Sequence, residues 1–326
     1  MPERNTMKKI QELQQVKGDA YDYYIAGNED TDLFEKIFLV DDIVEEICKP
    51  DKYFLIGEKG SGKTAYSVYM SKSDKINSFC SISLVENTLY QRFLNMKRQK
   101  ALELSSFKDV WINLIYLILA EKIRKEYGET FFSSIKYKQL SKAIDVFYSD
   151  AFKPEFVNAF EFVDNASASI NSMMKQGLFS TGTKASAETS QKYVEQSFQI
   201  SLLKIRDGFE KAFMSVNLKK PTILFVDGID ARPRDIDNEQ YFECLVGLVN
   251  AVLEMNQSFL KEKQIKIMLL IRPDIMYKMP VHNMNQKLRN NSVLLNWVTS
   301  YRKYIDSKLF KIADDYFMKQ QDYSYE

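Results

Sequence analysis

The residues with the clearest capacity for chemistry stand together at positions 57–64, which read GEKGSGKT. They fit the phosphate-binding pattern of a glycine, four residues and then Gly-Lys-Thr, and the apolar run YFLI precedes them as a strand would. A helix-compatible stretch follows, and the first amides of such a helix attract anions. Glycines 57, 60 and 62 let the loop take positive φ and turn its N–H groups inward. The stretch predicts a nucleotide-binding loop, and a chance glycine-rich turn is the weaker explanation.

Two side chains of this loop have predicted roles on a bound nucleotide. Lys63 would reach the β- and γ-phosphates, and the Thr64 hydroxyl would ligate Mg²⁺. The predicted binding residues are Gly57, Glu58, Lys59, Gly60, Ser61, Gly62, Lys63, Thr64 and Ala65. The sequence has no Asn-Lys-x-Asp stretch of the guanine-reading type, which favours ATP. The predicted cofactors are therefore ATP and Mg²⁺.

A second candidate strand ends in acids, in the stretch TILFVDGID at 222–230. Its apolar run 223–226 is typical of a strand that is buried on both faces of a parallel sheet. Asp227 ends the run, where a carboxylate can hold the hydration shell of Mg²⁺. Asp230 follows beyond Gly228, where a turn can bring it to the γ-phosphate side to orient an attacking water. The alternative is an apolar strand that merely stops at an Asp-Gly turn.

Three further apolar runs complete a predicted set of five strands. They are FCSIS (79–83), IKIMLLI (265–271) and SVLLNW (292–297). The run 265–271 leads into Arg272 and Pro273, and a proline at that point forces the chain out of the sheet. Arg272 is thereby left at the carboxyl edge, which faces the ligand crevice in an open parallel sheet.

Composition restricts the classes of partner. Forty-five Lys and Arg nearly balance 44 Asp and Glu, so the global charge favours neither nucleic acid nor an anionic membrane. The local basic clusters 95–100 and 121–126 are typical of solvated helix faces. The longest apolar run, 110–120, is about half as long as a bilayer requires and predicts a buried core helix ending near Gly128. Three separated cysteines and the single His282 lack metal or redox spacing, which predicts reduced thiols in a cytoplasmic protein without membrane contact.

The order of these motifs resembles the additional-strand P-loop ATPases, the group that contains the AAA+, KAP and STAND families. The loop, a long spacer, LFVDGID, a helix and LLIRPD follow one another as in that group. The resemblance implies an α/β fold: a three-layer sandwich whose parallel five-stranded sheet has the order 5-1-4-3-2. By position it matches Asp227 to the Mg²⁺ carboxylate, Asp230 to the acid that orients water and Arg272 to the γ-phosphate sensor. The implied activity is Mg²⁺-dependent ATP hydrolysis, with Lys63, Asp230 and Arg272 as catalytic residues.

Within that group, the D-G-hydrophobic-D ending and the sensor arginine look most like STAND and KAP proteins. The segments DARPRD, IRPDI and NSVLLNW are also similar to uncharacterised bacterial P-loop ATPases, some of which accompany antiphage defence modules. Many AAA+ members carry the catalytic glutamate where this chain has Gly228, so hydrolysis must rely on Asp230 or be slow. Arg232 and Arg234 could reach the phosphate of a neighbouring subunit in a ring, although such loop arginines are more often exposed or paired locally.

The stretch 85–219 has several helical patterns and no convincing strand. It is too long to be a simple crossover connection between two strands. It is predicted as a helical insertion, with a mobile loop near 165–191 that is rich in Ser, Ala and Thr. The predicted segments are an N-terminal helical arm (1–32), a P-loop ATPase core (33–84 and 220–312), the insertion (85–219) and a C-terminal helical tail (313–326).

The favoured function is a regulatory ATPase or assembly scaffold, in which ATP binding and slow hydrolysis shift the protein between two states. Its expected partners are a second copy of the chain and an effector protein, and antiphage defence is the setting that the resemblance suggests. A nucleic-acid motor or loader is the alternative, but it needs a basic track that the near-neutral charge does not show. A small-molecule or nucleotide kinase would use an arginine-rich lid, whereas LFSTGTK (178–184) has one lysine and no arginine.

Overall fold

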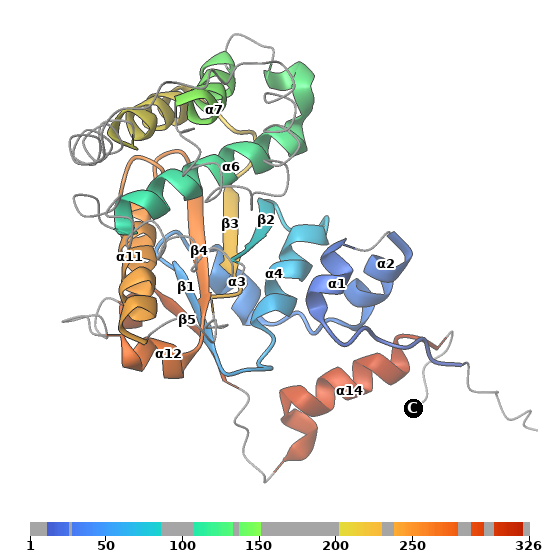
Figure 1. Ribbon diagram of the computed structural model, residues 1–326. Coiled ribbons are helices and arrows are strands. Elements are labelled where there is room, and N and C mark those ends of the chain that lie inside the picture. The colour runs from blue at the N-terminus through green and yellow to red at the C-terminus, as the bar shows by residue number, and fades with distance from the viewer. Residues whose placement is uncertain are drawn as a thin grey trace, which may run out of the picture.

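The computed structural model describes residues 12–25, 28–85, 107–132, 137–150, 202–229, 238–279, 288–296 and 303–321. Its strands are β1 (Phe54–Gly57), β2 (Phe79–Leu84), β3 (Thr222–Asp227), β4 (Ile265–Ile271) and β5 (Ser292–Leu295). They form one parallel sheet in the order β2-β3-β4-β1-β5 (Figure 1). Read from its other edge, this is the order 5-1-4-3-2, so the predicted α/β fold class is confirmed.

Helices cover both faces of the sheet. One face carries α1 (Ala20–Ile25), α2 (Asn28–Ile37), α3 (Asp42–Cys48) and α4 (Lys63–Lys72). The other carries α6 (Phe107–Phe132), α7 (Lys138–Asp150), a helix at 202–215 and α11 (Asn238–Asn256). Figure 1 shows α6 crossing above the strands and α1 and α4 beside them. The remaining elements are the short helix α12 (Pro273–Lys278), the 3₁₀ turn η1 (Tyr304–Asp306) and α14 (Lys308–Met318).

Each strand divides its side chains between two cores, because successive residues of a strand point to opposite faces. On β3, Leu224 and Val226 join the core under α6 and α11, whereas Ile223 and Phe225 join the core under α1, α3 and α4. Every residue of β3 and of β4 is buried. This two-sided burial explains why both strands read as unbroken apolar runs.

The helices of the predicted insertion belong to the same core as the sheet. Trp111 of α6 is buried, and its indole Nε1 donates a hydrogen bond to the Cys244 carbonyl of α11 (3.1 Å). On α7 and the helix 202–215, Phe147 and Phe209 are buried in that cluster as well. The described helices between 107 and 215 thus form part of one layer, and the division of the chain into the predicted segments stays a prediction.

The apolar run at 110–120 lies in α6, where each of its residues is buried. The helical path is interrupted at Gly128 (φ 76°, ψ 168°), close to its expected end. Within the described ranges, no helix is long and apolar enough to cross a membrane. The predicted loop 165–191 and the side chains of Asp230, Arg232, Arg234 and His282 lie outside the described residues.

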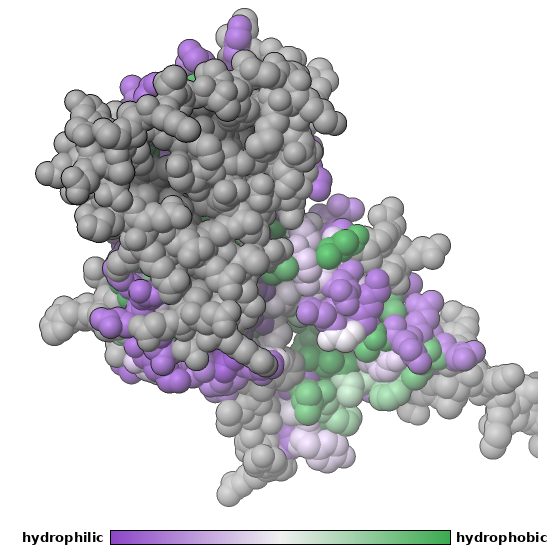
Figure 2. All heavy atoms as spheres, in the orientation of Figure 1, coloured by the Kyte–Doolittle hydropathy of each residue, from purple (hydrophilic) through white to green (hydrophobic). Residues whose placement is uncertain are grey.

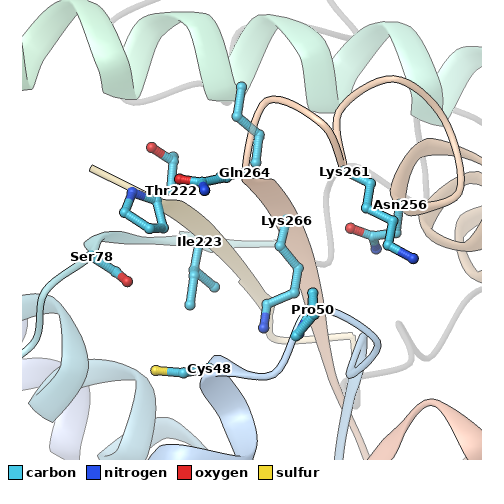
Figure 3. Close-up of a pocket in the computed structure, with 11 residues that line it drawn as sticks. Cys48, Pro50, Ser78, Thr222, Ile223, Asn256, Lys261, Gln264 and Lys266 are labelled. Carbon is cyan, nitrogen blue, oxygen red and sulfur yellow. The ribbon is translucent and has the colours of Figure 1, made fainter. Parts of the chain in front are cut away.

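A pocket of about 210 Å³ opens at the amino edge of the sheet, where β3 and β4 begin (Figure 3). The Lys266 side chain extends across it toward the segment of Cys48 and Pro50. Its Nζ donates hydrogen bonds to the carbonyls of Ile47 and Lys49 at the end of α3. Burial lowers the pKa of Lys266 to about 8, although the neighbouring Cys48, Cys80 and Asp51 act in the opposite direction. A largely buried lysine therefore ties α3 to the sheet.

This lowered pKa predicts a stability that rises with pH. Between the folded pKa near 8 and the unfolded pKa of about 10.4, the unfolded chain holds a proton that the folded chain has released. The quantity to measure, by urea denaturation, is the wild-type free energy of unfolding minus that of Lys266→Met. This difference should rise by about 2 kcal/mol from pH 7 to pH 10.

Lys261→Met is the matched control, because Lys261 lines the same pocket but is exposed. Its difference from the wild type should stay level over the same pH range. If the stability difference between the wild type and Lys266→Met were also independent of pH, burial would not lower the pKa of Lys266.

Candidate nucleotide-binding site

The strand register brings the predicted site residues to one edge of the sheet. Ile56 on β1 pairs with Ile271 on β4, so Gly57 and Arg272 follow side by side at the carboxyl ends of those strands. On the other side of β4, Val226 of β3 pairs with Leu269, which places Asp227 near the same edge. In open parallel sheets the carboxyl edge is where ligands bind.

The loop between β1 and α4 has the backbone of an anion cradle. Gly60 and Gly62 have φ of 79° and 88°, and Gly62 is the residue from which α4 starts. Gly57 instead ends β1 without a positive φ, which corrects the expectation of positive φ at all three glycines. Its lack of a side chain matters for space, because a Cβ there would lie 2.2 Å from Ser61 Oγ. The loop can therefore close tightly over the first turn of α4.

Lys63 is the first residue of α4 and is only 7% exposed. Its Nζ donates hydrogen bonds to the carbonyls of Gly57 (2.8 Å) and Glu58 (3.1 Å). These bonds fold the side chain back along its own loop instead of letting it extend into solvent. The ammonium is thereby held beside the helix start, where the dipole of α4 and the loop amides favour an anion.

The two predicted metal ligands contact each other. Thr64 Oγ1 donates a hydrogen bond to Asp227 Oδ2 (2.6 Å), and Asp227 is 7% exposed. The other carboxylate oxygen, Oδ1, accepts from the Gly228 amide (2.7 Å). Two oxygens that occupy neighbouring octahedral positions on Mg²⁺ lie about 3.0 Å apart, given metal–oxygen distances near 2.1 Å. The Thr64–Asp227 pair therefore fits Mg²⁺, either directly or through its hydration shell.

Gly228 shows why no side chain follows the strand-ending carboxylate. Its φ is +84°, and a Cβ there would lie 3.0 Å from the Val85 carbonyl. The Val85 amide in turn donates to the Asp227 carbonyl (2.7 Å), which continues the β2–β3 ladder one residue past the end of β2. Both conformation and space thus disfavour any side chain at this position, a glutamate included.

Asp230, the predicted acid, lies outside the described residues, but the chain just before it is anchored. Ile229 is buried, and its carbonyl accepts a hydrogen bond from the Tyr241 hydroxyl of α11 (2.6 Å). This contact fixes the start of the acidic turn. Nothing in the sequence pattern pointed to Tyr241 for this purpose, since it lies on the apolar stripe of its helix.

Arg272 precedes α12 and is engaged by an acid of that helix. Its Nε and Nη2 donate to the two carboxylate oxygens of Asp274 (3.0 and 2.9 Å). The guanidinium is therefore at the predicted edge of the sheet but is held by Asp274, and a phosphate would have to compete for it. Its role as a sensor stays a prediction.

Behind the loop, the Asp41 carboxylate joins three segments through hydrogen bonds that the sequence motifs did not reveal. Asp41 Oδ1 accepts from the Ile43 amide (3.1 Å) and from the Tyr66 hydroxyl of α4 (2.9 Å). Its Oδ2 accepts from Lys308 Nζ at the start of α14 (2.5 Å). Burial and then the bond to Asp41 raise the pKa of Tyr66. An Asp before an apolar run signals a helix cap, but the two distant partners could not be read from spacing.

The close approach at Gly228 predicts a position-specific cost for a methyl group. Gly228→Ala should lower the free energy of unfolding by about 1–3 kcal/mol, since alanine resists the left-handed conformation and its Cβ would press on the Val85 carbonyl. Gly208→Ala is the matched control, because nothing lies within 4 Å of a Cβ in that helix. It should be neutral or stabilising by up to about 1 kcal/mol in chemical denaturation. Equal effects at both positions would contradict the described turn.

Comparisons of the whole chain with protein-family models, with curated proteins and with solved structures found no match. The observations that bear on function are therefore those of the geometry at the carboxyl edge of the sheet. That geometry comprises the loop 57–64, the Thr64–Asp227 pair and the turn at Gly228.

Proposed function

We propose that this protein is an ATP-binding P-loop ATPase of the additional-strand type, Mg²⁺-dependent and slow, that acts as a nucleotide-dependent switch or assembly scaffold. The observation that carries the proposal is the 2.6 Å hydrogen bond between Thr64 and Asp227. It joins the loop 57–64 to the end of a second buried strand and brings two oxygen atoms together beside the start of α4, which supports a metal site there. A glycine-rich turn with no nucleotide to bind has no need of this second partner.

In the proposed mechanism, the loop amides and Lys63 bind the β- and γ-phosphates, and Thr64 and Asp227 hold the metal side. Mg²⁺, when bound, neutralises charge that develops on the phosphates. The orientation of the attacking water is left to Asp230, because Gly228 offers no side chain. Asp230 lies two residues after Gly228, the position at which many AAA+ proteins carry the catalytic glutamate, and this displacement supports slow hydrolysis.

Contacts behind the loop support a switch. Tyr66 follows Lys63 by one helical turn and binds Asp41, which also binds Lys308 of α14. A shift of α4 on binding phosphate would therefore be felt at the start of α14. The segment around α14 exposes large apolar side chains: Tyr304, Ile305, Leu309, Phe310 and Phe317. This surface suits a second copy or an effector protein. A setting in antiphage defence rests on the resemblance of the motif segments alone.

The proposal predicts that one lysine of the loop is needed for ATP and another is not. Lys63→Ala should weaken ATP binding about 10- to 100-fold, because a charge-assisted contact to the phosphates is lost in a poorly solvated site. Lys59→Ala is the matched control, since alanine keeps the Lys59 backbone amide of the proposed phosphate cradle and removes only an exposed side chain. It should change the dissociation constant by less than about threefold. Isothermal titration with an unchanged affinity for Lys63→Ala would remove the basis for nucleotide binding.

A second prediction separates nucleotide binding, ATP hydrolysis and nucleotide-driven association. Asp230→Asn keeps the shape but removes the charge and most of the basicity, so steady-state hydrolysis should fall about 10²-fold while Mg-ATP still binds. Asp227→Asn should instead weaken the Mg²⁺ dependence of nucleotide binding and of hydrolysis together. Because Asp230→Asn holds ATP unhydrolysed, any ATP-driven self-association seen by light scattering should outlast that of the wild type. Identical mass and partner affinity in apo, ADP and ATP-analogue samples would speak against a switch.

A further inference from the structure

A second polar groove lies at the opposite side of the sheet from β5, along the start of the edge strand β2. It has a volume of about 730 Å³, and none of the loop residues 57–64 lines it. One wall is formed by α1 and the end of α4, and the other by the part of α6 just before Gly128; Figure 1 shows the positions of these helices. Among the described residues the groove shares no lining residue with the proposed nucleotide site, so we expect a ligand to bind there with or without ATP.

The groove concentrates positive charge in a chain whose total charge is close to zero. Its charged lining residues are Lys72, Lys122, Lys125, Lys219, Lys220, Asp74 and Glu126. Among the described lining residues, positive groups therefore exceed negative ones by three, whereas the whole chain has a formal net charge of +1. A cationic concavity of this kind raises the local concentration of a polyanion. Figure 2 shows hydrophilic residues next to apolar ones over the flank that α1 and α4 form.

Aromatic rings stand on both walls of the groove. On the α1 side, Tyr21 and Tyr24 pack with ring centroids 5.4 Å apart, and Lys72 Nζ lies 5.6 Å from the Tyr24 ring. On the α6 side, Phe79 and Tyr127 meet edge to face at 6.2 Å. All four rings are half-buried, so each is fixed in place and still has surface in the groove. Fixed aromatic rings beside lysines are the combination that stacks bases and binds phosphates in single-stranded nucleic acids.

The floor of the groove adds hydrogen-bonding groups. Ser81 is 3% exposed and lines the groove, and its Oγ has no hydrogen-bond partner among the residues that the structure describes. The Phe79 and Val85 amides donate to Pro221 and Asp227 across the ladder, so the alternate amides, Cys80 among them, face the open edge. A buried polar atom without a partner is costly unless a ligand or water satisfies it.

An acidic peptide that adds a strand to β2 fits the groove less well. Strand addition uses the outward amides along the whole edge, but only the first half of β2 lines the groove. Farther along, the Ile82 amide already donates to the Tyr24 hydroxyl (3.4 Å). We propose that the groove binds a single-stranded nucleic acid, with its phosphates on the lysines and its bases against the paired aromatic rings.

The test measures fluorescence anisotropy of a labelled twelve-nucleotide oligo-dT with the full chain at several salt concentrations. Lys219→Glu with Lys220→Glu should weaken binding at least about tenfold and reduce the slope of log affinity against log salt by about 1.4, since roughly 0.7 is lost for each phosphate contact on a single strand. Lys303→Glu with Lys311→Glu is the matched control, because it changes the charge equally at exposed lysines outside the groove. This control should keep the wild-type affinity and slope. Thermal melting monitored by circular dichroism verifies that each variant is folded.

Two additional arms identify the occupant and separate this site from the nucleotide site. Tyr21→Ala should weaken oligo-dT binding with little change in the salt slope, because stacking does not depend on counterion release. Lys63→Ala should bind oligo-dT as the wild type does, even if it binds no ATP. Equal losses in the groove and control pairs would overturn the proposal. So would competition by a poly-glutamate peptide as strong as that by unlabelled oligo-dT, which would assign the groove to acidic chains in general.

Discussion

The candidate site depends on the parallel register of three neighbouring strands. Because β1, β4 and β3 run side by side in one direction, the loop after β1, Arg272 after β4 and Asp227 at the end of β3 all reach one edge. The hydrogen bond from Thr64 to Asp227 is the direct product of that register. An error of one residue would turn each side chain to the other face and separate this pair. Burial of β3 and β4 on both faces makes such an error costly.

The same tight construction limits the chemistry. The ladder between β2 and β3 continues to Val85, whose carbonyl would lie 3.0 Å from a Cβ at Gly228. The site therefore combines well-placed binding groups with no acid directly after Asp227. In the proposed switch, such a site holds ATP for long periods, and the contacts of Asp41 with Tyr66 and Lys308 connect that state to the apolar surface around α14. Tight ATP binding and slow hydrolysis would then both prolong the ATP-bound state.

Local patterns predicted the loop, the apolar strands and the strand-ending Asp227, because each depends on residues close together in the sequence. The sheet order came from resemblance to a family, since hydrophobic periodicity does not determine which strands pair. The role of Gly57 was misread, because crowding by Ser61 is a matter of space that a motif does not show. The groove along β2 was also missed, since its lysines come from segments near 72, 122 and 219 and form no continuous basic run. Of the two basic clusters seen in the sequence, 121–126 contributes to it, and 95–100 lies outside the described residues.

In the proposed function, Thr64 and Asp227 together hold the metal of a bound nucleotide. Electron paramagnetic resonance of Mn²⁺ in place of Mg²⁺ tests it most directly, because the bound ion gives a signal distinct from that of the free ion. With a non-hydrolysable ATP analogue present, the wild type should bind Mn²⁺ more tightly than it does without nucleotide. Thr64→Val, which removes the hydroxyl and keeps the shape, should lose most of that gain. If the wild type and Thr64→Val bound Mn²⁺ equally, with or without the analogue, the metal site would not be at this pair.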